Sequence, residues 1–118
     1  MDLEYIRDYC LKKKAVTESF PFGEDTLVYK VMSKIFMLTG FDIPLSLNLK
    51  CEPELAVELR ERYEAVQPGY HMNKKHWNTI VVDGTIPPKE ILRMIDHSYD
   101  MVVKGLKIKE KEKLREIK

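Results

Sequence analysis

The sequence predicts a two-layer α+β sandwich in which helices cover one face of an antiparallel sheet. Residues 45–50 alternate leucine with Ser, Asn and Lys, a pattern typical of a strand with one buried face and one solvent-facing side. Turn signals separate this segment from other strand-like runs, and the segments between and around them repeat apolar residues every three or four positions. We therefore expect the element order α-β-β-β-α-β-β-α.

Length and composition indicate one ordinary globular domain. The chain has 118 residues, of which 44% are apolar and 33% are charged, and this profile is not that of a disordered chain. No basic stretch followed by an apolar run opens the sequence, and uninterrupted apolar runs are only about four residues long. We expect a cytoplasmic protein without membrane association, with a single domain over residues 1–106 and a charged helical extension or disordered tail over residues 107–118.

The first element is predicted to be an amphipathic helix over residues 2–14. Leu3, Ile6 and Cys10 recur at helical spacing, and Asp2 is suited to the N-cap. Three consecutive lysines at the end of this segment would complement the helix dipole. Cys10 is expected to be a reduced, partly buried thiol on the apolar face.

A loop is expected over residues 17–26, because Pro and Gly interrupt the apolar string Phe20-Pro21-Phe22-Gly23. Two exposed phenylalanines would be costly, so this loop is expected to fold back over the core. The remaining elements are predicted as strands over residues 27–32, 34–39, 45–50, 66–70 and 77–82, and as helices over residues 53–63 and 88–106.

Aromatic and cationic residues gather between the last two predicted strands. The segment holds the single Trp, two of the three His and two adjacent Lys, and it follows a Pro68-Gly69 turn. Lysines offer charge to phosphates, amides offer hydrogen bonds and flat side chains offer stacking surfaces, so the cluster favours nucleic-acid binding. The candidate residues are Lys74 and Lys75, Asn73 and Asn78, and Tyr70, His71, His76 and Trp77, with Lys34 and Lys50 as further candidates for phosphate contacts.

The same cluster has a plainer interpretation, in which Tyr70 and Trp77 cap the core and the lysines form a solvated turn. Charge distribution bears on the choice. Residues 104–118 carry seven Lys or Arg and three Glu, a charge of +4, whereas residues 1–103 carry a charge of −3. A mildly acidic body argues against a uniformly basic DNA-binding face, so any DNA contact must use a local patch.

Metal binding and catalysis have little support in the sequence. His71 and His76 are five positions apart, a spacing that suits neither one helix face nor one strand face, and Cys51 would supply only a third ligand. No nucleophile elbow or glycine-rich phosphate loop is present. We therefore expect no metal, no cofactor and no enzymatic activity.

Several strings in the chain resemble the MmcQ/YjbR family of small bacterial proteins. They lie between residue 18 and about residue 106, and they are Glu18-Ser19-Phe20-Pro21-Phe22-Gly23, Lys34-Ile35-Phe36, Leu49-Lys50, Pro53-Glu54, Leu59-Arg60, Pro68-Gly69-Tyr70-His71-Met72-Asn73-Lys74-Lys75-His76-Trp77 and Ser98-Tyr99-Asp100-Met101-Val102. The resemblance implies a compact two-layer fold like that of type III secretion chaperones and frataxin-like (CyaY-like) proteins. It also implies a "double wing" DNA-binding motif, whose wings would be the hairpins near Ser33 and around residues 70–77.

Together, residues and resemblance predict a small cytoplasmic DNA-binding protein. Its expected contact residues are Lys34, Lys50, Tyr70, His71, Asn73, Lys74, Lys75, His76 and Trp77. The alternative is a non-enzymatic, chaperone-like protein-interaction module that meets a partner, such as a second copy of itself in a homodimer, through its polar sheet face or its final helix. A large exposed apolar patch would favour this alternative.

Overall fold

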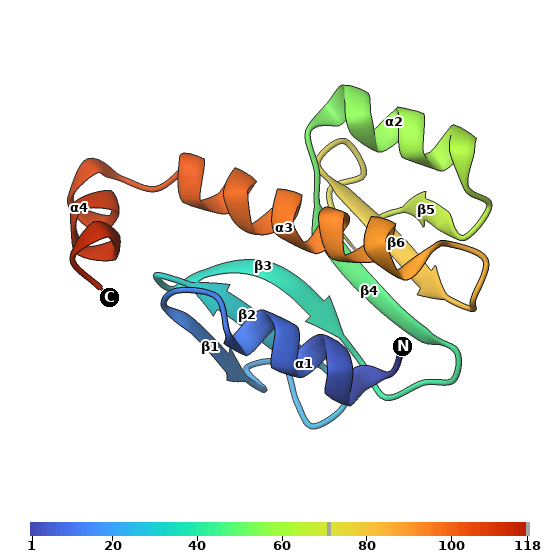
Figure 1. Ribbon diagram of the computed structural model, residues 1–118, viewed down its shortest axis with the longest axis horizontal. Coiled ribbons are helices and arrows are strands. Elements are labelled where there is room, and N and C mark those ends of the chain that lie inside the picture. Colours follow the sequence, from blue (N-terminus) through green and yellow to red (C-terminus); the bar gives the residue numbers. More distant parts are fainter. Residues whose placement is uncertain (71, 118) are drawn as a thin grey trace.

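The computed structural model describes residues 1–70 and 72–117 (Figure 1). Lys118 and His71, one of the predicted DNA contacts, lie outside the described residues. The elements are α1 (Leu3–Leu11), β1 (Val16–Ser19), β2 (Leu27–Val31), β3 (Lys34–Thr39), β4 (Leu45–Lys50), α2 (Pro53–Arg62), β5 (Val66–Pro68), β6 (Trp77–Val82), α3 (Pro88–Lys104) and α4 (Ile108–Glu116).

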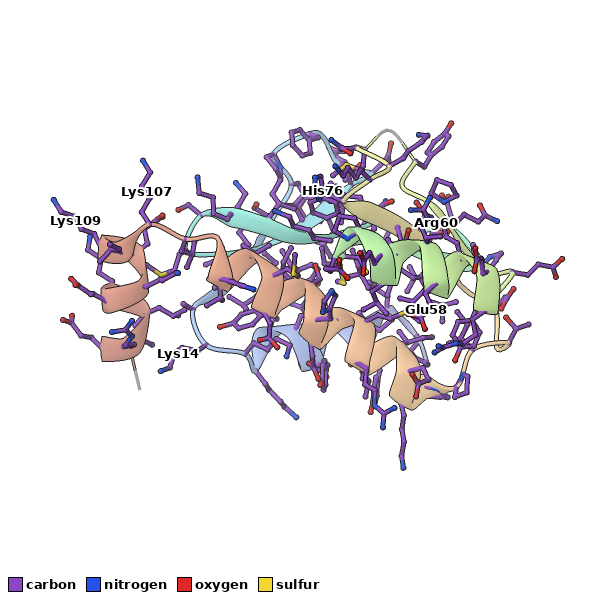
Figure 2. All side chains as sticks on the ribbon, turned by 90° about the horizontal axis from the view of Figure 1, so that it is seen from above. Lys14, Glu58, Arg60, His76, Lys107 and Lys109 are labelled. Atoms are coloured by element: carbon purple, nitrogen blue, oxygen red, sulfur yellow. The ribbon has the colours of Figure 1, made fainter. Side chains whose placement is uncertain are left out.

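Within the described residues, the strands form one six-stranded sheet in the order β1-β2-β3-β4-β6-β5. Every neighbouring pair is antiparallel. Helices α1 and α3 lie on the same side of this sheet, as the view from above shows (Figure 2). The fold class predicted from the sequence, an antiparallel sheet with its helices on one face, is confirmed.

The alternation in β4 separates the two faces of the sheet. Leu45, Leu47 and Leu49 are buried against the helices, while Ser46, Asn48 and Lys50 are half-buried on the opposite side, which we call the outer face. The core on the helix side also contains Ile6 from α1, Tyr29 from β2, Phe36 and Met37 from β3, Ile80 from β6 and Ile95 from α3. A bulge between Tyr29 and Lys30 in the β2–β3 pairing allows Phe36 and Met37 both to be buried.

One strand lies where a loop was expected. Residues 16–19 form β1, which pairs along its length with β2. The sequence pattern of β1 is weak because β1 is a short edge strand of mainly polar residues, none of them fully buried. Glu18 connects β1 to α1 and β2, because its carboxylate accepts hydrogen bonds from Arg7 at 2.7 Å and from the Tyr29 hydroxyl at 3.0 Å. The hydrogen bond from Arg7 is the main reason that the pKa of Glu18 lies below its usual value.

Helix α1 ends at Leu11, earlier than predicted, so the three lysines do not continue it. Lys13 instead forms an ion pair with Asp96 on α3, and its ammonium lies over the rings of Tyr9 and Tyr99. Ala15 has a positive φ of 61°, which reverses the chain into β1. Tertiary contacts with α3 therefore decide the conformation of this lysine run, and they override the helical propensity of the three residues.

The loop with the two phenylalanines is exposed, contrary to the sequence-based expectation. Phe20 and Phe22 are 50% and 66% exposed, and Phe20 stacks on Phe41 with ring centroids 6.2 Å apart. Ile43 is 99% exposed in the neighbouring β3–β4 connection. We call Phe20, Phe22, Phe41 and Ile43 the aromatic patch.

The charged segment after α3 forms helix α4, which lies beside the turn that joins β2 to β3 (Figure 1). Leu106 and Leu114 are buried and belong to the same core cluster as the sheet residues. Leu114 on α4 and Leu106 just before it therefore dock this mainly charged helix against the core.

Ser98 connects the helix layer to the centre of the sheet. This fully buried hydroxyl donates to the Phe36 carbonyl at 2.5 Å and accepts from the Lys50 amide at 2.8 Å. It thus satisfies two backbone groups at the point where β3 and β4 stop pairing with each other. Because unpaired backbone groups are costly when buried, this α3 side chain fixes the end of β4.

The substitution Ser98→Ala is expected to lower the free energy of unfolding by about 2 kcal/mol, because it leaves both backbone groups without their partner. Urea unfolding followed by circular dichroism measures this change. Ser46→Ala is the matched control, since Ser46 lies half-buried on the outer face, and a change within about 0.5 kcal/mol is expected there. Equal effects of the two substitutions would contradict the bridging role of Ser98.

Candidate nucleic-acid interface

Two strand connections project from the same end of the sheet. β3 and β6 both pair antiparallel with β4, so both begin at the end where β4 finishes. The β2–β3 turn and the β5–β6 connection therefore lie at this end, on either side of β4 in the strand order. We call it the hairpin end. The aromatic patch lies at the opposite end, because its residues follow β1 and β3 where those strands finish.

The β2–β3 turn consists of Met32 and Ser33, which have positive φ values of 49° and 69°. Two central residues with positive φ are typical of the type I′ turn, whose twist matches that of the adjoining strands. Lys34 pairs with Val31 directly after this turn and is exposed. The hairpin predicted near Ser33 is therefore present, and it carries a lysine at its tip.

Lys50 and Trp77 lie opposite each other in the register of β4 and β6. Both are half-buried, and Lys50 belongs to the outer face. Trp77 is thus neither a fully buried core residue nor a free surface group. The pair combines a cation and an aromatic surface on one side of the hairpin end, midway between its two projecting connections.

The β5–β6 connection begins with a close contact at Gly69. The Gly69 amide donates to the Trp77 carbonyl at 2.9 Å, and a Cβ at this position would lie 2.8 Å from that of Trp77. Only glycine fits without a shift of the tryptophan backbone, which explains the Pro68-Gly69 dipeptide. Tyr70 is 69% exposed, and its amide donates to Thr79 Oγ1 at 2.9 Å.

Lys74 and Lys75 have different roles although they are adjacent. The Lys74 ammonium donates to the Gly69 carbonyl at 3.1 Å and so closes the β5–β6 connection. The exposed Lys75 has its amide held by Asn73 Oδ1 at 2.9 Å, a local turn that asparagine commonly forms. Lys75 therefore has the ammonium that is better placed to meet a phosphate, and Lys74 supports the loop that presents it.

Arg60 on α2 is a contributor that the sequence did not reveal. Its guanidinium donates to the carbonyl of Lys74 at 3.1 Å and to that of Ala56, also at 3.1 Å. His76 adds a second link, because its carbonyl accepts from the Cys51 amide at 2.8 Å. No local sequence pattern indicates a contact made fourteen positions further along the chain.

Asn78, a candidate for nucleic-acid hydrogen bonds that is not among the expected contact residues, is buried. Asn78 is only 1% exposed and lies on the helix side of β6, opposite Leu49 in register. Its side chain donates to the Ala56 carbonyl at 3.3 Å. Alternation along β6 could have indicated this, since Asn78 shares its face with the buried Ile80.

Charge is unevenly distributed between the two ends of the sheet. Among the described residues, the four ion pairs join Arg7 to Glu18, Lys13 to Asp96, Arg62 to Glu58 and Arg93 to Glu90. Lys34, Lys50 and Lys75 take part in none of them. Figure 2 shows Lys107 and Lys109 extending from α4 on the side of the molecule where the sheet lies. The loops at the opposite end carry acidic residues, namely Glu24, Asp25 and Asp42. At the hairpin end, the carboxylate of Glu52 caps α2 by accepting hydrogen bonds from the Glu54 and Leu55 amides.

Other kinds of site have less support in the described part of the chain. No group of three or more His, Cys, Asp or Glu side chains there could hold a metal ion. Cys10 and Cys51 are free and buried, and burial raises the pKa of the Cys51 thiol to about 11, so it stays protonated at neutral pH. Over residues 1–70 and 72–117, no helix has both the length and the apolar character needed to cross a bilayer.

The fold and the hairpin end define a small α+β domain with two connections projecting beside its central strand. The chain belongs to the YjbR family, whose model matches residues 11–101. It is 33% identical over 115 residues to YjbR of Escherichia coli K12, covering 97% of each chain, and 35% identical over 98 residues to YbdF of E. coli O157:H7, covering 81% of this chain and 80% of that one. Both relatives are described as uncharacterised proteins.

Solved structures show the same fold. A Deinococcus radiodurans protein with the DUF419 domain superposes with a TM-score of 0.89 at 39% identity, covering 95% of this chain and 86% of that one. A Pseudomonas syringae protein superposes with a TM-score of 0.75 at 30% identity, covering 86% of this chain and 98% of that one. These similarities establish family and fold.

The two neighbouring lysines offer a direct test of the loop geometry. Lys74→Ala is expected to lower the free energy of unfolding by about 1 kcal/mol, because its ammonium closes the connection to Gly69. Lys75→Ala removes the same charge from the next position and is expected to change stability by less than about 0.5 kcal/mol. Urea unfolding of both variants at equal salt measures the two free energies of unfolding. A larger loss of stability in Lys75→Ala than in Lys74→Ala would contradict the roles assigned to the two lysines.

Proposed function

We propose that this protein binds duplex DNA through the hairpin end, without enzymatic chemistry or a cofactor. The observation that carries the proposal is the projection of two lysine-bearing connections on either side of β4. Lys34 is on one connection, Lys75 is on the other, and Lys50 lies between them. Such an arrangement suits the "double wing" mode that the family resemblance implies, and it suits a cytoplasmic location.

The spacing of the two connections is compatible with a DNA groove. The middle of the β2–β3 pair lies three strand positions from the middle of the β6–β5 pair. At about 4.8 Å per strand this is about 14 Å, close to the width of the major groove at about 12 Å. The connections are thus far enough apart to contact the phosphates on both sides of a groove.

Unpaired lysines are what phosphate contacts require. Positive charge that is not already neutralised by a carboxylate can release counterions from DNA on binding, and this release drives sequence-independent affinity. The acidic loops lie at the other end of the sheet, where they would not face the DNA. Exposed Lys107 and Lys109 on α4 provide further positive charge beside the β2–β3 turn (Figures 1 and 2).

The proposal predicts a salt dependence that two lysines control. In fluorescence anisotropy with a labelled generic duplex between about 50 and 200 mM salt, the wild-type protein should bind with a steep log–log slope. Lys34→Ala/Lys75→Ala should flatten this slope by about 2, or about 0.9 for each lost phosphate contact. Lys75→Ala alone should flatten it by about half as much.

Lys89→Ala is the control matched to Lys75→Ala, because it also removes one exposed lysine but at the start of α3, on the far end of the sheet. The slope of this variant should equal that of the wild type. Absence of wild-type binding at low salt would end the proposal. A slope that falls equally in both single variants would point to diffuse attraction rather than contact through the hairpins.

The aromatic patch favours a second candidate function, a protein-interaction module. Phe22 and Ile43 are exposed well beyond what packing requires, and clustered apolar exposure marks contact surfaces. A homodimer formed through this patch predicts a mass that rises toward twice the chain mass with concentration in sedimentation equilibrium. Phe22→Ser/Ile43→Ser should remain monomeric, whereas a wild-type protein that is monomeric throughout would exclude self-association through the patch.

A further inference from the structure

A cavity of about 270 Å³ lies between α2, α3 and the helix side of β4 and β6. Its wall is mainly apolar, formed by Leu49, Leu55, Leu59, Ile80 and Met94. Arg62 and Arg93 also line it and are exposed, so the cavity reaches the surface. Among its lining residues, Lys50 also belongs to the proposed DNA-binding surface, and the rest of the lining lies on the helix side of the sheet and on α2 and α3.

A buried polar atom without a partner lies in this wall. Asn78 lines the cavity and is 1% exposed. Its Nδ2 end is held by the Ala56 carbonyl at 3.3 Å, but Oδ1 has no hydrogen-bond partner among the described residues. Buried polar groups are nearly always paired. An acceptor fixed in this way, beside an apolar cavity, is suited to a hydrogen-bond donor on a bound molecule.

The remaining lining residues are mainly polar and cationic. Arg62 and Arg93 stand at the surface, with Arg93 paired to Glu90 at 2.6 Å and Arg62 paired to Glu58 at 3.3 Å. His97 accepts a hydrogen bond from the Glu52 amide through Nε2 at 3.1 Å, which leaves Nδ1 as the protonated nitrogen of the neutral ring. Three lining cations, Lys50, Arg62 and Arg93, stand against the carboxylates of Glu58 and Glu90. Among the described residues Lys50 forms no ion pair, and this excess of positive charge favours an anionic group on the ligand.

We propose that this cavity is a binding site for a small amphipathic carboxylic acid. The apolar body of the ligand lies against the leucines and Met94, a hydroxyl or N–H group donates to Asn78 Oδ1, and the carboxylate stays near Arg62 and Arg93. Small-molecule sites combine an apolar wall with a few such convergent polar groups. The volume limits the body to about one aromatic ring or a short branched chain.

The test compares para-hydroxyphenylpropionate with phenylpropionate, which lacks the phenolic donor. Each is titrated into ¹⁵N-labelled full-length protein, and amide shifts are followed by NMR. Saturable shifts are expected at Ala56, Asn78 and Met94, with the hydroxylated acid binding about tenfold more tightly because its donor meets Asn78 Oδ1. Shifts confined to the hairpin end would place the acid at another site and overturn the proposal.

Two variants separate the polar contacts. Asn78→Leu should remove the preference for the hydroxylated acid while retaining phenylpropionate binding, and Arg93→Gln should weaken both acids by about fivefold. Equal affinity of the two acids for the wild type would overturn the role of Asn78, and this comparison does not require Asn78→Leu to fold. Absence of saturable shifts with either acid would reject the site.

Discussion

The alternation of β4 is the constraint on which the rest of the structure depends. This strand pairs on both sides, with β3 and with β6, and six consecutive residues match β6 in register. A shift by one residue would move Leu45, Leu47 and Leu49 from the core to solvent. The apolar face therefore fixes the register, and the register fixes which side chains of β6 lie opposite those of β4.

Two adjacent register pairs on β4 and β6 connect the two sites. Lys50 lies opposite Trp77 at the hairpin end, and Leu49 lies opposite Asn78 in the wall of the cavity. Successive residues of a strand point to opposite faces, but Lys50 also lines the cavity, so the two sites meet at this residue. Ser98 holds this point from the helix side through the Lys50 amide, so the same packing supports both surfaces.

Sequence reasoning succeeded where local pattern decides structure. Strands with internal apolar alternation and helices with an apolar stripe were predictable, because burial dictates their period. β1 was missed because an edge strand can be polar when its neighbour supplies the hydrogen bonds. The aromatic loop was misplaced because apolar residues are not required to be buried, and exposed ones can serve a contact surface.

In the candidate site, too, the sequence indicated the local elements but not the contacts between distant residues. The sequence indicated which segment carries the cations, and the structure confirmed a hairpin at each of the two predicted positions. The sequence did not indicate that Lys74 donates a hydrogen bond to the Gly69 carbonyl or that Arg60 reaches the loop from α2. These contacts depend on how the chain returns on itself, and neither composition nor spacing encodes that geometry.

The mildly acidic charge of residues 1–103 was the strongest sequence-based argument against DNA binding. Its effect on a bound polyanion depends on how far the acidic residues lie from the hairpin end. A strand of six residues spans about 20 Å, whereas charges are screened over about 8 Å at physiological ionic strength. The acidic loops holding Asp25 and Asp42 are thus electrostatically remote from Lys34, Lys50 and Lys75. A polyanion approaching the hairpin end responds to these lysines and to α4 rather than to the net charge, so an acidic average and a cationic binding surface are compatible in one small domain.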